Sequence, residues 1–173
     1  HNTIGGALNY ITRQPPESLE GRYLLDFGNK GQLNNIVTVG GSPAEDVAAQ
    51  LAVASFRRNP VMENRNPGQP DGNEVDSSAV RANFRITVSD RLEWLVSADA
   101  EQTDLASVLY SLGPGEPFQF APGLPLLPAS DPVRSGDVNA STGEFLHIRG
   151  LMARANFTTD TYRASFMFGR RDH

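Results

Sequence analysis

Strict alternation of apolar and polar residues marks one stretch of the chain more clearly than any other. Its apolar positions are Val80, Ala82, Phe84, Ile86 and Val88, and its polar positions are Arg81, Asn83, Arg85 and Thr87. A period of two residues places these two sets on opposite faces of a β-strand. One face carries two arginines and the other carries no charge. This pattern indicates a strand between lipid and water, because a charge facing mid-membrane costs about 2–4 kcal/mol.

Weaker versions of the same alternation predict six further strands. They span residues 21–28, 34–41, 47–57, 92–101, 145–157 and 162–168. Within the stretch 145–157 the apolar positions change parity at Gly150, and an isolated glycine in a strand often marks a bulge. We therefore expect an antiparallel, all-β fold of about seven strands, with a bulge at Gly150.

The connections between these strands alternate in length. After a tight turn at 29–32, short turns are predicted at 42–46, 89–91 and 158–160, and long polar stretches at 58–77 and 104–144. Outer-membrane barrels have short periplasmic turns and long extracellular loops, whereas long structureless loops count against a compact soluble domain. The pattern predicts part of a transmembrane β-barrel that begins on the periplasmic side and finishes near the cell surface.

Composition narrows the classes of protein further. The chain has 173 residues, of which 39% are hydrophobic and 20% charged, so it is able to bury a core. No apolar run approaches the ~20 residues that a membrane-spanning helix needs. A net charge of −5 and a pI near 5.1 argue against a general nucleic-acid binder. Cysteine is absent, which excludes disulfides, a thiolate nucleophile and Cys-ligated metal sites.

The beginning of the chain carries a more specific signal. Residues 2–15 read Asn-Thr-Ile-Gly-Gly-Ala-Leu-Asn-Tyr-Ile-Thr-Arg-Gln-Pro, which is a Gly-Gly bend, a short β-like run and a proline stop. This order closely resembles the last segment of the plug domain in TonB-dependent outer-membrane receptors. The family usually has Arg or Lys before the first Asn, where this chain has His1. The residues that carry the resemblance are Asn2, Thr3, Ile4, Gly5, Gly6 and Ala7.

The resemblance implies a domain layout, a location and a function. Residues 1–16 are expected to be the C-terminal end of the plug, and residues 17–173 the N-terminal part of a barrel of about 22 strands. The chain is accordingly expected to be a fragment of a bacterial outer-membrane protein. Members of this family import ferric siderophores or similarly scarce nutrients, energised by TonB, which binds a segment that these residues do not include. The implied partners are TonB, outer-membrane lipid and a small-molecule cargo such as an iron chelate, with no cofactor and no nucleic acid.

Two other classes of protein remain open at this point. A passive, porin-like or structural outer-membrane barrel without TonB coupling shares every strand feature and differs only in residues 1–16 and what precedes them. A soluble β-sandwich that serves as a binding module also contains alternating strands. The strictly apolar faces of 80–88 and 92–100 speak against the sandwich.

An enzyme is not expected. Asp99 and Glu101 lie two residues apart on one strand face, superficially like a glycosidase pair. No nucleophile elbow, zinc-protease motif or phosphate-binding glycine loop accompanies them. His1, His147 and His173 are far apart in sequence, so no metal site is expected either.

The candidate ligand contacts come from two regions of the chain. Strand parity places four charged side chains on the water side of the wall: Arg81, Arg85, Asp99 and Glu101. The alternative is that these four are solvated wall charges that pair across the barrel. Phe118 and Phe120, in the long stretch 104–144, are candidates to cover an apolar or aromatic ligand, and the alternative for them is an ordinary surface loop.

Overall fold

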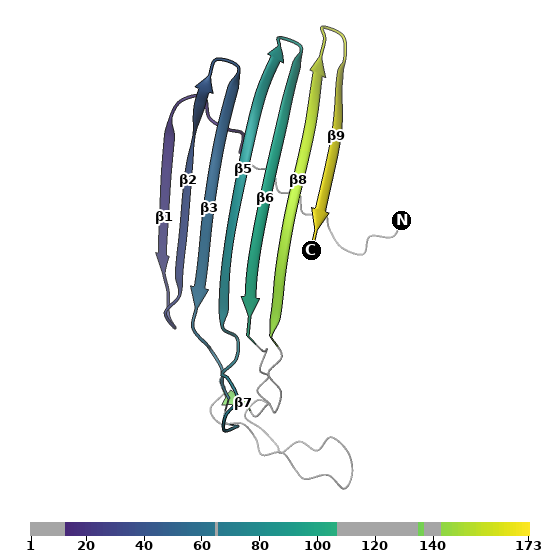
Figure 1. Cartoon of the computed structure of the whole chain (residues 1–173). Coiled ribbons are helices and arrows are strands. Elements are labelled where there is room, and N and C mark those ends of the chain that lie inside the picture. The colour runs from purple at the N-terminus through teal and green to yellow at the C-terminus, as the bar shows by residue number, and fades with distance from the viewer. Residues whose placement is uncertain (1–12, 65, 107–134, 137–142) are drawn as a thin grey trace.

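A computed structural model describes residues 13–64, 66–106, 135–136 and 143–173, which form an all-β fold (Figure 1). The strands are β1 (Glu20–Phe27), β2 (Leu33–Ala44), β3 (Val47–Arg58), β4 (Glu63–Asn64), β5 (Val75–Ser89), β6 (Leu92–Leu105), β7 (Ser135–Gly136), β8 (Glu144–Thr158) and β9 (Arg163–Asp172). Seven strands make one antiparallel sheet in the order β1-β2-β3-β5-β6-β8-β9, while β4 and β7 form a separate parallel pair. The predicted antiparallel, seven-stranded fold class is thereby confirmed.

The sheet is open at both edges. Within the described residues, β1 pairs only with β2 and β9 pairs only with β8. Short turns lie at one end of the sheet and the long connections at the other (Figure 1). The tight turn between β1 and β2 is an exception, because it lies at the end with the long connections.

The turn between β1 and β2 confirms the prediction for residues 29–32. The Gln32 amide donates to the Asn29 carbonyl at 3.2 Å, and Lys30 and Gly31 have φ angles of 61° and 63°. Two consecutive positive φ values define a type I′ turn, whose twist matches that of the flanking strands. The hairpin register therefore follows from local sequence.

Several strands are longer than their alternation predicts. β3 extends to Arg58, β5 begins at Val75 and β6 ends at Leu105, so the predicted loops 58–77 and 104–144 both begin or end inside strands. The backbone ladder continues there through polar side chains; for example, Arg57 pairs with Asp76. Where both faces of a strand carry polar residues, its sequence no longer alternates although its hydrogen bonds persist.

The bulge predicted at Gly150 is wrong. β8 pairs with β6 in unbroken register along its length, and Gly150 lies opposite Asp99. The change of parity has another cause: Leu146 and Ile148 point to one face of the sheet and Leu151 to the other. The apolar residues of β8 therefore change from one face of the sheet to the other near the N-terminal end of the strand. No extra residue is inserted between β8 and β6.

One face of the sheet carries a continuous apolar band. Its members are Tyr23, Leu25, Phe27, Val37, Val39, Val47, Ala49, Leu51, Val53, Val80, Ala82, Phe84, Ile86, Leu92, Trp94, Val96, Ala98, Ala100, Leu151, Ala153, Ala155, Phe157, Ala164, Phe166 and Phe168, all of one strand parity. Large members stay exposed: Phe84 is 42% exposed and Phe166 73%. Within the described residues, no second layer of protein covers this band.

The border of the apolar band towards the long connections is level across the central strands and displaced on the outer ones. Its last members on β2, β3, β5 and β6 lie in one row of the paired register: Val37, Val53, Val80 and Ala100. On β1 its last member towards the long connections is Phe27, which is level with Arg57 of β3 through the paired register. On β9 its last member is Phe168, which is level with Ala49 of β3. Between the two outer strands the border of the band is thus displaced by about eight residues along β3.

Polar side chains border the band on the side of the long connections. The Tyr23 hydroxyl donates to Asn35 Oδ1 at 3.0 Å, and the Asn35 amide donates to Ser55 Oγ at 3.4 Å. Arg57 Nη2 forms an ion pair with Asp76 Oδ2 at 2.9 Å. These residues have the same parity as the band, so on β3 and β5 polar side chains replace the apolar ones towards the long connections, while on β1 the band continues to Phe27.

Candidate functional site

The opposite face of the sheet is polar and is crossed by the chain that precedes β1. We call residues 13–19 the crossing segment; part of it passes behind β2 and β3 in Figure 1. Pro15 is buried in it, beside Leu95 and Met152 of the sheet. Pro16 lies over Gly40, where a Cβ atom would come within 2.8 Å of the proline ring. A glycine on β2 therefore permits the close approach.

Two ion pairs and a backbone hydrogen bond hold the crossing segment against the sheet. Arg85 of β5 donates to Glu17 at 3.1 Å, and Arg13 donates to Glu20 at 3.0 Å. The Ser42 amide donates to the Glu17 carbonyl at 3.2 Å. The Arg85 side chain is only 20% exposed, because the segment and the neighbouring strands cover it.

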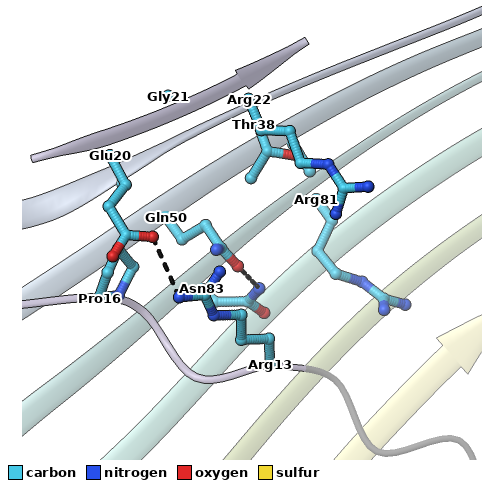
Figure 2. A pocket seen from close by; sticks show the side chains of 11 residues that line it. Arg13, Pro16, Glu20, Gly21, Arg22, Thr38, Gln50, Arg81 and Asn83 are labelled. Atoms are coloured by element: carbon cyan, nitrogen blue, oxygen red, sulfur yellow. Dashed lines mark hydrogen bonds and ion pairs between the residues drawn. The ribbon is translucent and has the colours of Figure 1, made fainter. Parts of the chain in front are cut away.

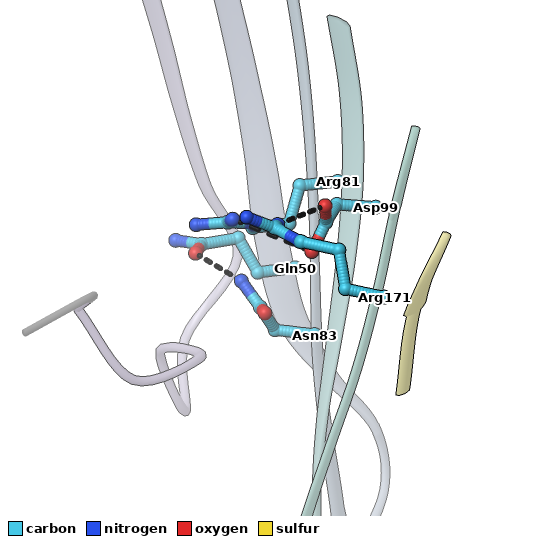
Figure 3. Close-up of polar contacts among 5 residues, drawn as sticks. All are labelled: Gln50, Arg81, Asn83, Asp99 and Arg171. Carbon is cyan, nitrogen blue, oxygen red and sulfur yellow. Dashed lines mark hydrogen bonds and ion pairs between the residues drawn. The ribbon is translucent and has the colours of Figure 1, made fainter. Parts of the chain in front are cut away.

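A charged cluster lies farther along the same face (Figure 3). Asp99 of β6 accepts a hydrogen bond from Arg171 of β9 at 2.7 Å and from Arg81 of β5 at 3.4 Å. The Asp99 side chain is 19% exposed. Gly150 of β8 makes room for it, since a Cβ atom there would lie 2.8 Å from Asp99 Oδ1. Two arginines on one carboxylate leave this cluster with a net positive charge.

A pocket of about 320 Å³ opens between the crossing segment and the strands (Figure 2). Arg22 and Arg81 extend into this region from β1 and β5, and Arg13 approaches from the crossing segment. Two amide side chains complete the polar lining: Asn83 donates to Gln50 Oε1 at 3.5 Å. The pocket combines several cations with neutral hydrogen-bonding groups, which suits the binding of a polar ligand.

The structure places all four predicted charged candidates on the polar face, as their parity indicates. Arg81 and Asp99 contact each other. Arg85 instead contacts the crossing segment, and Glu101 accepts a hydrogen bond from Thr103 at 3.3 Å. The four therefore form separate contacts and no single cluster.

The remaining predicted residues fall outside the described part of the chain. They are the plug-end residues Asn2, Thr3, Ile4, Gly5, Gly6 and Ala7, and the loop aromatics Phe118 and Phe120. Nothing in the structure tests them.

Sequence reasoning missed Arg22 and Arg171 as members of the site. Arg171 lies beyond the last alternating residue of β9, and its partner Asp99 is far away in sequence, so only the sheet register reveals their contact. Arg22 lies at a polar position in the alternating pattern of β1. No local feature distinguishes it from an ordinary solvent-exposed arginine on a strand.

The described residues contain neither a metal-binding cluster nor a membrane-spanning helix. No group of three or more His, Asp or Glu side chains lies close enough together to hold a metal ion. No helix in that part of the chain is both long and apolar enough to cross a membrane.

Comparison of the chain with protein-family models, curated proteins and solved structures gave no match. Function is therefore inferred from the faces, contacts and charges described above.

Proposed function

We propose that this chain is part of a TonB-dependent outer-membrane receptor, contributing the end of the plug and the first strands of the barrel. Its role is binding and active uptake of a scarce nutrient, of which a ferric siderophore is the commonest type in that family, and it has no catalytic role. The observation that carries the proposal is the exposed apolar band across all seven strands of the sheet.

The displacement of the band between the two outer strands agrees in size with a tilted barrel wall. Barrel strands tilt by about 35–45° to the barrel axis, so a level band must slip along the ladder from each strand to the next. With strands ~4.8 Å apart and ~3.4 Å per residue, six steps require a displacement of roughly six to nine residues. The displacement between β1 and β9, from the level of Arg57 to that of Ala49, falls in this range, but it arises at the outer strands, since the border is level from β2 to β6.

The crossing segment supports the plug in preference to a passive barrel. It joins the residues that resemble a plug end to β1, and it lies on the face opposite the apolar band. Chain that enters β1 from the interior side is what an N-terminal plug requires. A porin-like barrel offers no reason for a tethered segment at this place.

The first experiment is the intact mass and terminal sequence of the protein as its own organism makes it. We expect a much larger chain, with a plug and a TonB box before residue 1 and further strands after residue 173. A mature protein that runs only from His1 to His173 would rule out the receptor. The open edges leave backbone groups unpaired in lipid at several kcal/mol each, so these residues alone are not expected to insert as a stable monomer.

Lipid contact is tested separately by single-cysteine labelling of the full-length protein in vesicles. A polarity-sensitive fluorophore at Phe84 or Leu51 is expected to report a lipid environment and to be quenched by brominated lipid. The same fluorophore at Asn83, one residue along β5 from Phe84, is expected to escape this quenching. Equal quenching at both positions of β5 would contradict the assignment of the faces.

A further inference from the structure

The pocket under the crossing segment holds more positive than negative charge. Three guanidinium groups line it, from Arg13, Arg22 and Arg81, against one carboxylate, from Glu20. Glu20 is already paired with Arg13 at 3.0 Å. Within the described residues, no acidic side chain lies within ion-pair distance of Arg22.

Arg81 is also incompletely neutralised. Its acidic partner Asp99 is 3.4 Å away, whereas Arg171 holds the same carboxylate at 2.7 Å. The Arg81 side chain remains 40% exposed towards the pocket side of the sheet. Fixed positive charges beside a low-dielectric wall concentrate anions in the intervening space.

The rest of the lining suits a ligand with several oxygen atoms. Asn83, Gln50 and Thr38 add amide and hydroxyl donors around the arginines. Guanidinium groups bind carboxylates and phosphates with two parallel hydrogen bonds, which gives them geometric selectivity for such oxyanions. A volume of about 320 Å³ exceeds what one inorganic anion fills and accommodates a small molecule with more than one anionic group.

We infer that this pocket is an oxyanion-binding site, in which Arg22 and Arg81 hold carboxylate or phosphate groups and Asn83 and Gln50 add hydrogen bonds. The occupant is a small solute with several anionic groups or a carboxylate from a part of the protein outside the described residues. The inference rests on the proposed function in one respect, which is that this face lines the barrel interior.

The first arm of the test titrates the full-length protein in detergent with iron-free tricarballylate, and separately with inorganic phosphate, by calorimetry. Arg22→Gln and Arg81→Gln are each expected to weaken tricarballylate binding about tenfold, corresponding to ~1.4 kcal/mol. Arg149→Gln is the matched control, because Arg149 is an exposed arginine on the opposite face with no ion pair in the described residues. The Arg149→Gln variant is expected to bind tricarballylate with unchanged affinity.

The second arm measures the reactivity of the same arginines towards phenylglyoxal, mapped by mass spectrometry. Protection of Arg22 and Arg81, but not Arg149, by tricarballylate identifies a free solute as the occupant. Protection without added anion identifies a carboxylate of the protein, provided that Arg22→Gln and Arg81→Gln then lower the melting temperature and Arg149→Gln does not.

Two results overturn the inference. One is that Arg22 and Arg81 react as fast as Arg149 whether or not anions are present. The other is protection without anion binding and without any loss of melting temperature in the variants. Neither arm requires transport, so a passive barrel is able to pass this test and a confirmed TonB-dependent receptor is able to fail it.

Discussion

The two faces of the sheet come from one alternating sequence and have opposite surroundings. On β5, Phe84 belongs to an apolar band with no protein over it in the described residues, while the adjacent Arg85 is bound by Glu17 of the crossing segment. Apolar side chains are exposed on one face, and charged side chains are partly covered on the other. This is the reverse of a soluble sheet, whose apolar face meets the protein core. Under the proposed placement, lipid outside the band takes the place of the missing core.

The largest effect is expected when a charged residue is placed at the centre of the apolar band. Phe84→Arg is expected to lower the free energy of unfolding of the full-length protein in vesicles by about 2–4 kcal/mol, because the guanidinium would face lipid. Urea titration followed by intrinsic fluorescence gives the value. Asn83→Arg, at the neighbouring position on the polar face, is expected to lower it by less than Phe84→Arg, because it loses the hydrogen bond to Gln50 but places no charge in lipid. Equal losses for both variants would mean that the two faces meet the same medium.

The covering of the polar face depends on the contact between Gly40 and Pro16. Gly40→Ala would place Cβ 2.8 Å from the proline ring and 3.0 Å from the Ala49 carbonyl, so the crossing segment must lift. We expect a loss of about 1–3 kcal/mol and faster amide exchange at residues 17–19. Gly21→Ala is the control, since its Cβ would meet nothing within 4 Å. Unchanged exchange in Gly40→Ala would show that the segment is not held against the sheet.

A smaller effect is expected where Gly150 makes room for the charged cluster. Gly150→Ala would push Asp99 away from its arginines, at a cost of about 1 kcal/mol by thermal or urea unfolding. Gly169→Ala on the adjacent strand meets only ordinary contact, 3.8 Å from the Leu151 carbonyl. That control is expected to be neutral or slightly stabilising, because alanine loses less backbone entropy than glycine. A stabilised Gly150→Ala variant would contradict the described position of Asp99.

Comparing ion pairs on the two faces gives the smallest expected effect. Asp99→Asn removes a partly covered pair with Arg171 and is expected to cost about 0.5–1 kcal/mol. Asp76→Asn removes the pair with Arg57 at the border of the band, where both side chains are more than half exposed, and is expected to cost ~0–0.5 kcal/mol. Raising the salt concentration should reduce the second value more than the first. Identical values would indicate that water reaches both pairs equally.

The sequence was sufficient to predict the strands wherever one face is apolar and the other is polar. In Val80–Val88 the alternation predicts both the strand and its orientation. The prediction was incomplete at Val75–Ala79, where the face of the band becomes polar and the period disappears. Around Leu146 the strand was predicted, but the change of parity was wrongly interpreted as a bulge. The parallel pairing of β4 with β7 left no periodic signal, because two residues per strand are too few to show one.

The candidate site was predictable by face but not by contact. Parity alone placed Arg81 and Asp99 on the same side of the sheet. Their contact depends on the register of the hairpin between β5 and β6. The part that Arg171 plays in it depends on a strand that is far from Asp99 in sequence. The position of Pro16 over Gly40 depends on how the preceding chain is folded, which no local pattern encodes.

The length of β5 beyond the apolar band has a consequence for the height of the loops. The band positions of this strand end at Val80, but the strand begins at Val75. At a tilt of about 40°, these five residues rise roughly 13 Å above the hydrocarbon boundary under the proposed placement. The long connections therefore begin at or above the level of the lipid headgroups, at the ends of strands that are still paired with their neighbours. A solute approaching from outside the cell would meet protein before it met the lipid surface.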